Sequence, residues 1–106
     1  MKRKVLKIGG TYAANFWRFE ARYFHDLANA VEGRDVVSMK VDGRALDNAF
    51  DVCRKAFNQH ETTELYALGC YGYEYRDSYM YRHSLEMKNA CFFVFSGMLM
   101  AYLGLE

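Results

Sequence analysis

The amino-acid sequence predicts an α/β two-layer sandwich with the element order β-α-β-α-β-β and a long final β-hairpin. Three observations predict this fold. Short alternating apolar runs occur at the start of the chain and near residue 40, as in half-buried strands. Two longer stretches repeat apolar residues every three or four positions, as helices do, and a tyrosine-rich stretch after residue 63 alternates again. Two helices against one small sheet would bury the apolar faces of both.

The first half of the chain contains two strand-helix units. Residues 4–8 form a short apolar strand that ends at Gly9-Gly10, and Thr11 is a suitable N-cap for a helix over residues 12–31. The apolar stripe of that helix is Phe16, Phe19, Tyr23, Leu27 and Ala30. A second strand over residues 36–41 turns at Asp42-Gly43 into a helix over residues 44–59.

The second half is predicted to be strand-like. Residues 65–75 place tyrosines at alternate positions, Arg76-Asp77-Ser78 forms the hairpin tip, and the return strand starts near Tyr79. Residues 90–95, rich in aromatic and β-branched side chains, predict another strand. The apolar tail is expected to be buried, either by completing the sheet or by sealing a dimer interface, which is the favoured alternative.

Length and composition indicate a single domain over residues 1–106, with an apolar C-terminal extension at residues 90–106. The three cysteines, Cys53, Cys70 and Cys91, are far apart and odd in number, which argues against a secreted disulfide framework or a zinc site and favours an intracellular protein. The tail is too short to span a membrane. The histidines have no partner at a catalytic or metal-binding spacing, so we expect no enzyme activity, no metal and no cofactor.

Net charge is only +1, so a nucleic-acid site must come from local clustering of basic residues. Strand pairing could bring together five cations to attract phosphate, or leave them as a solvated edge: Lys2, Arg3, Lys4, Lys7 and Lys40. We expect Arg44, at a predicted helix start, either to face a ligand or to be solvated or paired with Asp42 or Asp47. Gly10 and Thr11 cradle a phosphate at a helix N-terminus, or form an ordinary turn.

The predicted hairpin interleaves rings with arginines, namely Tyr75, Arg76, Tyr79 and Arg82. Such a surface suits stacking on unpaired bases, although cross-strand ring pairs also stabilise a hairpin that binds nothing.

Two segments resemble the Alba superfamily. Residues 5–16 resemble its opening strand, Ile-Gly loop and helix, in which Asn15 precedes an aromatic residue, and residues 37–49 resemble its second strand and the turn here formed by Gly43-Arg44-Ala45. Residues 82–87 look like the start of its last strand. The resemblance implies a dimer, with itself or another Alba-like chain, that binds RNA or DNA in chromatin or ribonucleoprotein particles.

In that family the first loop, the turn before the second helix and the hairpin contact nucleic acid, and the resemblance adds Asn15 to the candidate residues. The first loop here lacks the usual lysines, and Asp42 stands where a basic residue is common. RNA is therefore favoured over DNA. The alternative is a protein-interaction subunit of a larger ribonucleoprotein or chromatin assembly, with little nucleic-acid contact, as the apolar tail suggests.

Overall fold

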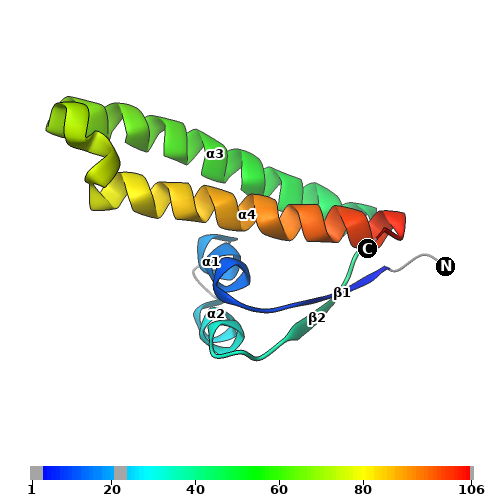
Figure 1. Cartoon of the computed structure of the whole chain (residues 1–106). Coiled ribbons are helices and arrows are strands. Elements are labelled where there is room, and N and C mark those ends of the chain that lie inside the picture. Colours follow the sequence, from blue (N-terminus) through cyan, green and yellow to red (C-terminus); the bar gives the residue numbers. More distant parts are fainter. Residues whose placement is uncertain (1–3, 21–23, 106) are drawn as a thin grey trace.

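A computed structural model describes residues 4–20 and 24–105. Figure 1 shows two long helices side by side, with two short helices and a two-stranded sheet along one side of them. The predicted β-α-β-α-β-β sandwich with a long β-hairpin is therefore wrong. In chain order the elements are β1 (Val5–Ile8), α1 (Thr11–Glu20), α2 (His25–Glu32), β2 (Val37–Lys40), α3 (Gly43–Tyr71), the 3₁₀ helix η2 (Gly72–Asp77) and α4 (Tyr79–Leu103).

The strands predicted near residues 5 and 40 are confirmed, and they form an antiparallel ribbon. Val5 lies opposite Lys40, and Lys7 lies opposite Ser38. Because side chains alternate between the faces of a strand, Leu6 and its inward neighbours pack against the helices while Lys7 and Lys40 stay exposed.

The single helix predicted over residues 12–31 is wrong, because α1 and α2 pack against each other instead of forming one rod. The Arg18 guanidinium on α1 pairs with Glu32 and donates to Asn29, both on α2. Ala28 and Val31 of α2 are fully buried. Tyr23, part of the predicted stripe, lies outside the described residues.

The predicted second helix and the strand after it are one helix, α3. Asp42 caps it, since the Asp42 carboxylate accepts a hydrogen bond from the Ala45 N–H at 2.8 Å. At about 1.5 Å per residue, its 29 residues span about 43 Å. The strand predicted over residues 65–75 is therefore wrong. Its alternating tyrosines do not mark one buried face, because the Tyr73 side chain is fully exposed.

The chain does reverse direction where the polar turn was predicted, but between helices. Gly72 has φ of 60°, a left-handed conformation that glycine adopts without a Cβ clash. Ser78 then starts α4: its hydroxyl donates to the Tyr75 carbonyl at 2.6 Å and accepts from the Tyr81 N–H at 3.3 Å. The predicted β-hairpin tip is thus a 3₁₀ turn followed by a capped helix.

The strand predicted over residues 90–95 is wrong as well, because this segment is the middle of α4. The tail nevertheless contributes to the core, with Ala90, Val94, Met98 and Ala101 spaced by four, four and three on a buried stripe. The Cys53 thiol of α3 donates to the Cys91 carbonyl at 3.1 Å, which places the two long helices in close contact. Other tail side chains remain exposed, so the tail is only partly buried.

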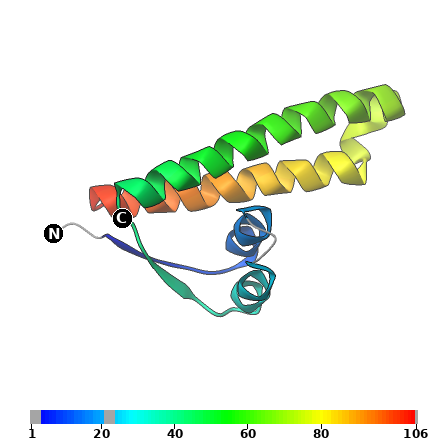
Figure 2. The same ribbon diagram turned by 180° about the vertical axis from the view of Figure 1, so that it is seen from behind.

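The core lies where the ribbon and α1 meet the α3–α4 hairpin, and the hairpin continues beyond it. The molecule measures 51 × 26 × 23 Å, and Figure 2 shows the long helices extending past α1 and α2 on the side away from β1 and β2. Within the described ranges, no helix combines the length and the apolar character needed to cross a membrane.

Candidate nucleic-acid interface

The ten residues predicted to bind nucleic acid do not form one site. Lys7, Lys40 and Arg44 lie on the ribbon and the first turn of α3, whereas Tyr75, Arg76, Tyr79 and Arg82 lie at the opposite end of the α3–α4 hairpin. Gly10, Thr11 and Asn15 belong to the loop before α1 and to α1 itself, between these two groups. The predicted site therefore divides into separate regions.

The first region, which we call the basic end, consists of Lys4, Lys7, Lys40 and Arg44; Lys2 and Arg3 of the predicted patch lie outside the described residues. Pairing of Val5 with Lys40 puts Lys7 and Lys40 on the same outward face of the ribbon, where diagonal neighbours are about 7–8 Å apart. Neither strand carries an acidic residue. The Lys4 ammonium lies 5.6 Å from the centroid of the Tyr102 ring, which holds this cation against the end of α4.

Arg44 is the second residue of α3 and is exposed. A cation at a helix N-terminus gains nothing from the helix dipole. The nearby Asp42 carboxylate is engaged by the backbone N–H of Ala45. The ion pairs among residues 4–20 and 24–105 join Arg18 to Glu32, and Arg54 and Lys55 to Asp51, so the four cations of the basic end have no ion-pair partner among the described residues.

The second region is the tip, formed by η2 and the first turn of α4. Its Tyr75 and Tyr79 rings have partners within the chain, whereas Tyr73 is fully exposed. The Tyr75 ring packs edge-on against Tyr81 at 5.3 Å, and the Arg76 guanidinium lies 5.3 Å from the Tyr75 centroid. The Tyr79 ring stacks on His83 at 5.5 Å. These rings stabilise the helical turn, which accounts for them without a bound base.

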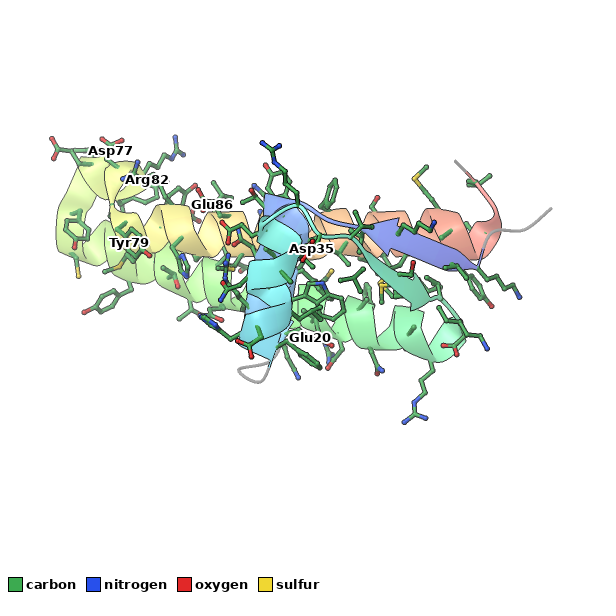
Figure 3. The ribbon with its side chains drawn as sticks, turned by 90° about the horizontal axis from the view of Figure 1, so that it is seen from below. Glu20, Asp35, Asp77, Tyr79, Arg82 and Glu86 are labelled. Atoms are coloured by element: carbon green, nitrogen blue, oxygen red, sulfur yellow. The ribbon has the colours of Figure 1, made fainter. Side chains whose placement is uncertain are left out.

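Charge also separates the tip from the basic end. Figure 3 shows Arg82 between Asp77 and Glu86. Between residues 60 and 88 the sequence has five acidic residues against three basic ones: Glu61, Glu64, Glu74, Asp77 and Glu86 against Arg76, Arg82 and Lys88. This balance opposes the approach of phosphate.

The loop before α1 is explained by packing. A Cβ on Gly9 would lie 2.9 Å from the Asp35 carbonyl oxygen, and Gly10 has φ of 96°. The Gly10 N–H donates to the Val31 carbonyl at 3.3 Å, so this donor is already used. Asn15 is buried and accepts from the Arg18 guanidinium at 3.1 Å. Thr11 is the exposed first residue of α1.

Sequence reasoning did not predict a buried polar pair between α3 and α4. His60 Nδ1 lies 2.9 Å from the Ser84 hydroxyl, and Ser84 lines a cavity of about 410 Å³ together with Arg18 and Gln59. The Ser84 hydroxyl donates to the Tyr81 carbonyl at 2.9 Å. With the Ser84 proton on that carbonyl, the neutral tautomer of His60 that carries its proton on Nδ1 donates to Ser84.

Burial lowers the pKa of His60, and the nearby Lys88 cation lowers it further, against smaller opposing effects of Glu64 and Glu61. The imidazole therefore stays neutral near pH 7, as a structural hydrogen-bond donor between the helices. No sequence motif predicts this pair, because isolated His and Ser residues 24 positions apart are common.

No protein-family model matches the sequence, and no curated protein or solved structure matches it significantly. The comparisons identify no family. The fold that the resemblance to Alba proteins implied is absent from the described residues, so the function must be argued from the surface of this chain alone.

Proposed function

We propose that the protein binds nucleic acid through its basic end, by contacts to the phosphate backbone. The observation that carries this proposal is a group of four cations without ion-pair partners among the described residues: Lys7 and Lys40 on the outward face of the ribbon, Lys4 before β1 against the end of α4, and Arg44 in the first turn of α3. Each cation would attract phosphate irrespective of base sequence.

The proposal differs from the sequence-based expectation in where the contacts lie. Tip residues contribute little, since Glu74 and Asp77 balance Arg76 and Arg82 there and the Tyr75 and Tyr79 rings pack against side chains of the same chain. Backbone contacts from lysines do not distinguish bases, so we expect weak sequence preference. Single-stranded RNA and duplex DNA are therefore both tested.

The test is a binding titration of fluorescent RNA and DNA with matched charge reversals. Lys7→Glu together with Lys40→Glu reverses two exposed cations of the basic end and should abolish binding. The control, Arg76→Glu together with Arg82→Glu, makes the same charge change at the tip and should reduce affinity by less than about threefold.

Arg44→Ala, which removes one exposed side chain, should weaken binding about two- to fivefold and leave folding intact. Equal losses from the ribbon pair and the tip pair would contradict a localised site. Unchanged affinity of Arg44→Ala for both RNA and DNA would remove this residue from it.

The alternative function, a protein-interaction subunit with little nucleic-acid contact, is favoured by one observation: several large apolar side chains of α4 are exposed. The same titration separates the two functions. Absence of binding to RNA and DNA at low salt would support the alternative.

A further inference from the structure

The C-terminal half of α4 carries an exposed apolar stripe opposite its buried one. Its five side chains are 38–51% exposed: Phe92, Phe93, Leu99, Met100 and Leu103. They recur at intervals of one, six, one and three, with Ser96 between them, so they share one side of the helix. A stripe of this kind marks an interaction surface.

Strand β1, which has an unpaired edge, lies next to this stripe. The Val41 N–H donates to the Lys4 carbonyl at 2.7 Å, so these residues form a hydrogen-bonded pair in the ribbon. Such pairs alternate in antiparallel sheets, so Leu6 and Ile8 bond to β2, whereas the N–H and C=O groups of Val5 and Lys7 point to the other edge. Within the described ranges, no strand pairs with that edge.

The strand edge and the stripe border one groove. A cavity of about 350 Å³ is lined on one side by residues 6–9 and on the other by Phe93, Gly97 and Met100 of α4. Leu6 lies over Gly97, where an added Cβ would be 3.6 Å from the nearer Leu6 methyl carbon, which keeps β1 close to the helix. An occupant would therefore need both backbone groups for β1 and an apolar surface for α4.

We propose that this groove is a twofold interface with a second copy of the chain, in which β1 pairs antiparallel with the partner's β1 and the two α4 stripes pack together. A second copy supplies both requirements at once, because in a twofold interface each copy presents the same patch. The five stripe residues leave roughly 450 Å² of apolar surface exposed on each copy, and the strand edge adds to this area. Summed over two copies, the area is close to the total of about 1,000 Å² that specific interfaces exceed.

The alternation of hydrogen bonds selects the register of this pairing. If Val5 faces the partner's Lys7, the outward groups of Val5 and Lys7 on both copies are all used, in four backbone hydrogen bonds. That register centres the twofold axis on Leu6 and keeps the two copies of Lys7 apart. Pairing Lys7 with the partner's Lys7 would satisfy fewer groups and oppose like charges.

The inference does not depend on nucleic-acid binding, since it rests on backbone groups and apolar surface. If both hold, the four-stranded sheet carries Lys7 and Lys40 from two copies on one face. Oligomeric state is measured without nucleic acid, so the two proposals can fail separately.

Sedimentation velocity of the full chain tests the interface. The wild type should be a dimer at about 100 μM. Val5→Lys places a lysine opposite the partner's Lys7 and should raise the dimer dissociation constant at least about tenfold, and adding Lys7→Glu should restore it. The matched control, Ser38→Lys, adds a lysine opposite Lys7 within the ribbon, away from the β1 edge, and should leave the dimer unchanged.

A second pair of variants tests the α4 stripe. Met100→Glu should weaken the dimer at least about tenfold, whereas Leu65→Glu, on the distant part of α3, should not change it. Circular dichroism of each variant checks that the fold is retained. A monomeric wild type would overturn the proposal, as would a dimer that responds to neither Val5→Lys nor Met100→Glu.

Discussion

His60 shows how one buried side chain can make stability depend on pH. Because burial lowers its pKa below the ordinary value of 6.5, the unfolded chain takes up a proton that the folded chain refuses. The free energy of unfolding therefore has its full value above pH 6.5, the ordinary pKa of histidine, and falls as pH decreases from there through the lowered pKa of His60.

Thermal unfolding between about pH 8 and pH 5 should therefore show a falling Tm for the wild type. His60→Gln retains a hydrogen-bonding group but does not titrate, so its Tm should fall less over the same range. An equal fall in both proteins would assign the pH dependence to other groups.

The cysteines should differ in reactivity although all three are thiols. Burial raises the pKa of Cys53 to about 11 and that of Cys91 to about 12, so neither forms the reactive thiolate near neutral pH. Cys70 is exposed near the end of α3. Iodoacetamide should label Cys70 alone in the folded protein and all three cysteines in denaturant, as read by mass spectrometry. Labelling of Cys53 or Cys91 at the rate of Cys70 would contradict their burial.

At the scale of elements, the sequence predicts the two strands and the start of the second helix, but not where that helix ends. Past residue 59 the α3–α4 contact is made by small or polar side chains, such as Ala67 on α3 and Ser84 on α4. Large apolar residues there, such as Leu65, are exposed instead. Apolar periodicity therefore does not predict a helix past residue 59, although the segment contains good helix formers.

The strand predicted over residues 90–95 is wrong for a related reason. Residues 91–95 are Cys-Phe-Phe-Val-Phe, a composition typical of strands. Packing against α3 and the ribbon overrides this local preference, because a helix buries Cys91 and Val94 together on one side. Of the candidate site, the ribbon cations and Arg44 follow from the confirmed strands and turn, whereas the tip residues were placed by an incorrect β-hairpin.

The cap of α4 can be tested directly. Ser78→Ala removes the hydroxyl that bonds both the Tyr75 carbonyl and the Tyr81 N–H, and should lower the free energy of unfolding by about 1 kcal/mol. Asn58→Ala, at an exposed site within α3, should lower it by less than about 0.5 kcal/mol. Denaturant unfolding measures both, and an equal effect would show that Ser78 does not act as a cap.

At the scale of the whole molecule, charge is distributed unevenly along a long body. The four cations of the basic end lie where β1 and the start of α3 meet the end of α4, and the tip, in which two acids balance two bases, lies at the other end of the α3–α4 hairpin (Figure 1). With a net charge of only +1, this separation allows local attraction of phosphate while the molecule as a whole stays nearly neutral.

The salt dependence of binding to single-stranded RNA tests most directly whether the basic end contacts the phosphate backbone. Each phosphate contact contributes about −0.7 to the slope of log K against log salt, so four contacts predict a slope near −2.8. Lys7→Ala with Lys40→Ala should bring the slope to about −1.4, and Arg76→Ala with Arg82→Ala should leave it unchanged. A slope near zero for the wild type, or one that changes only with the tip variant, would contradict the account.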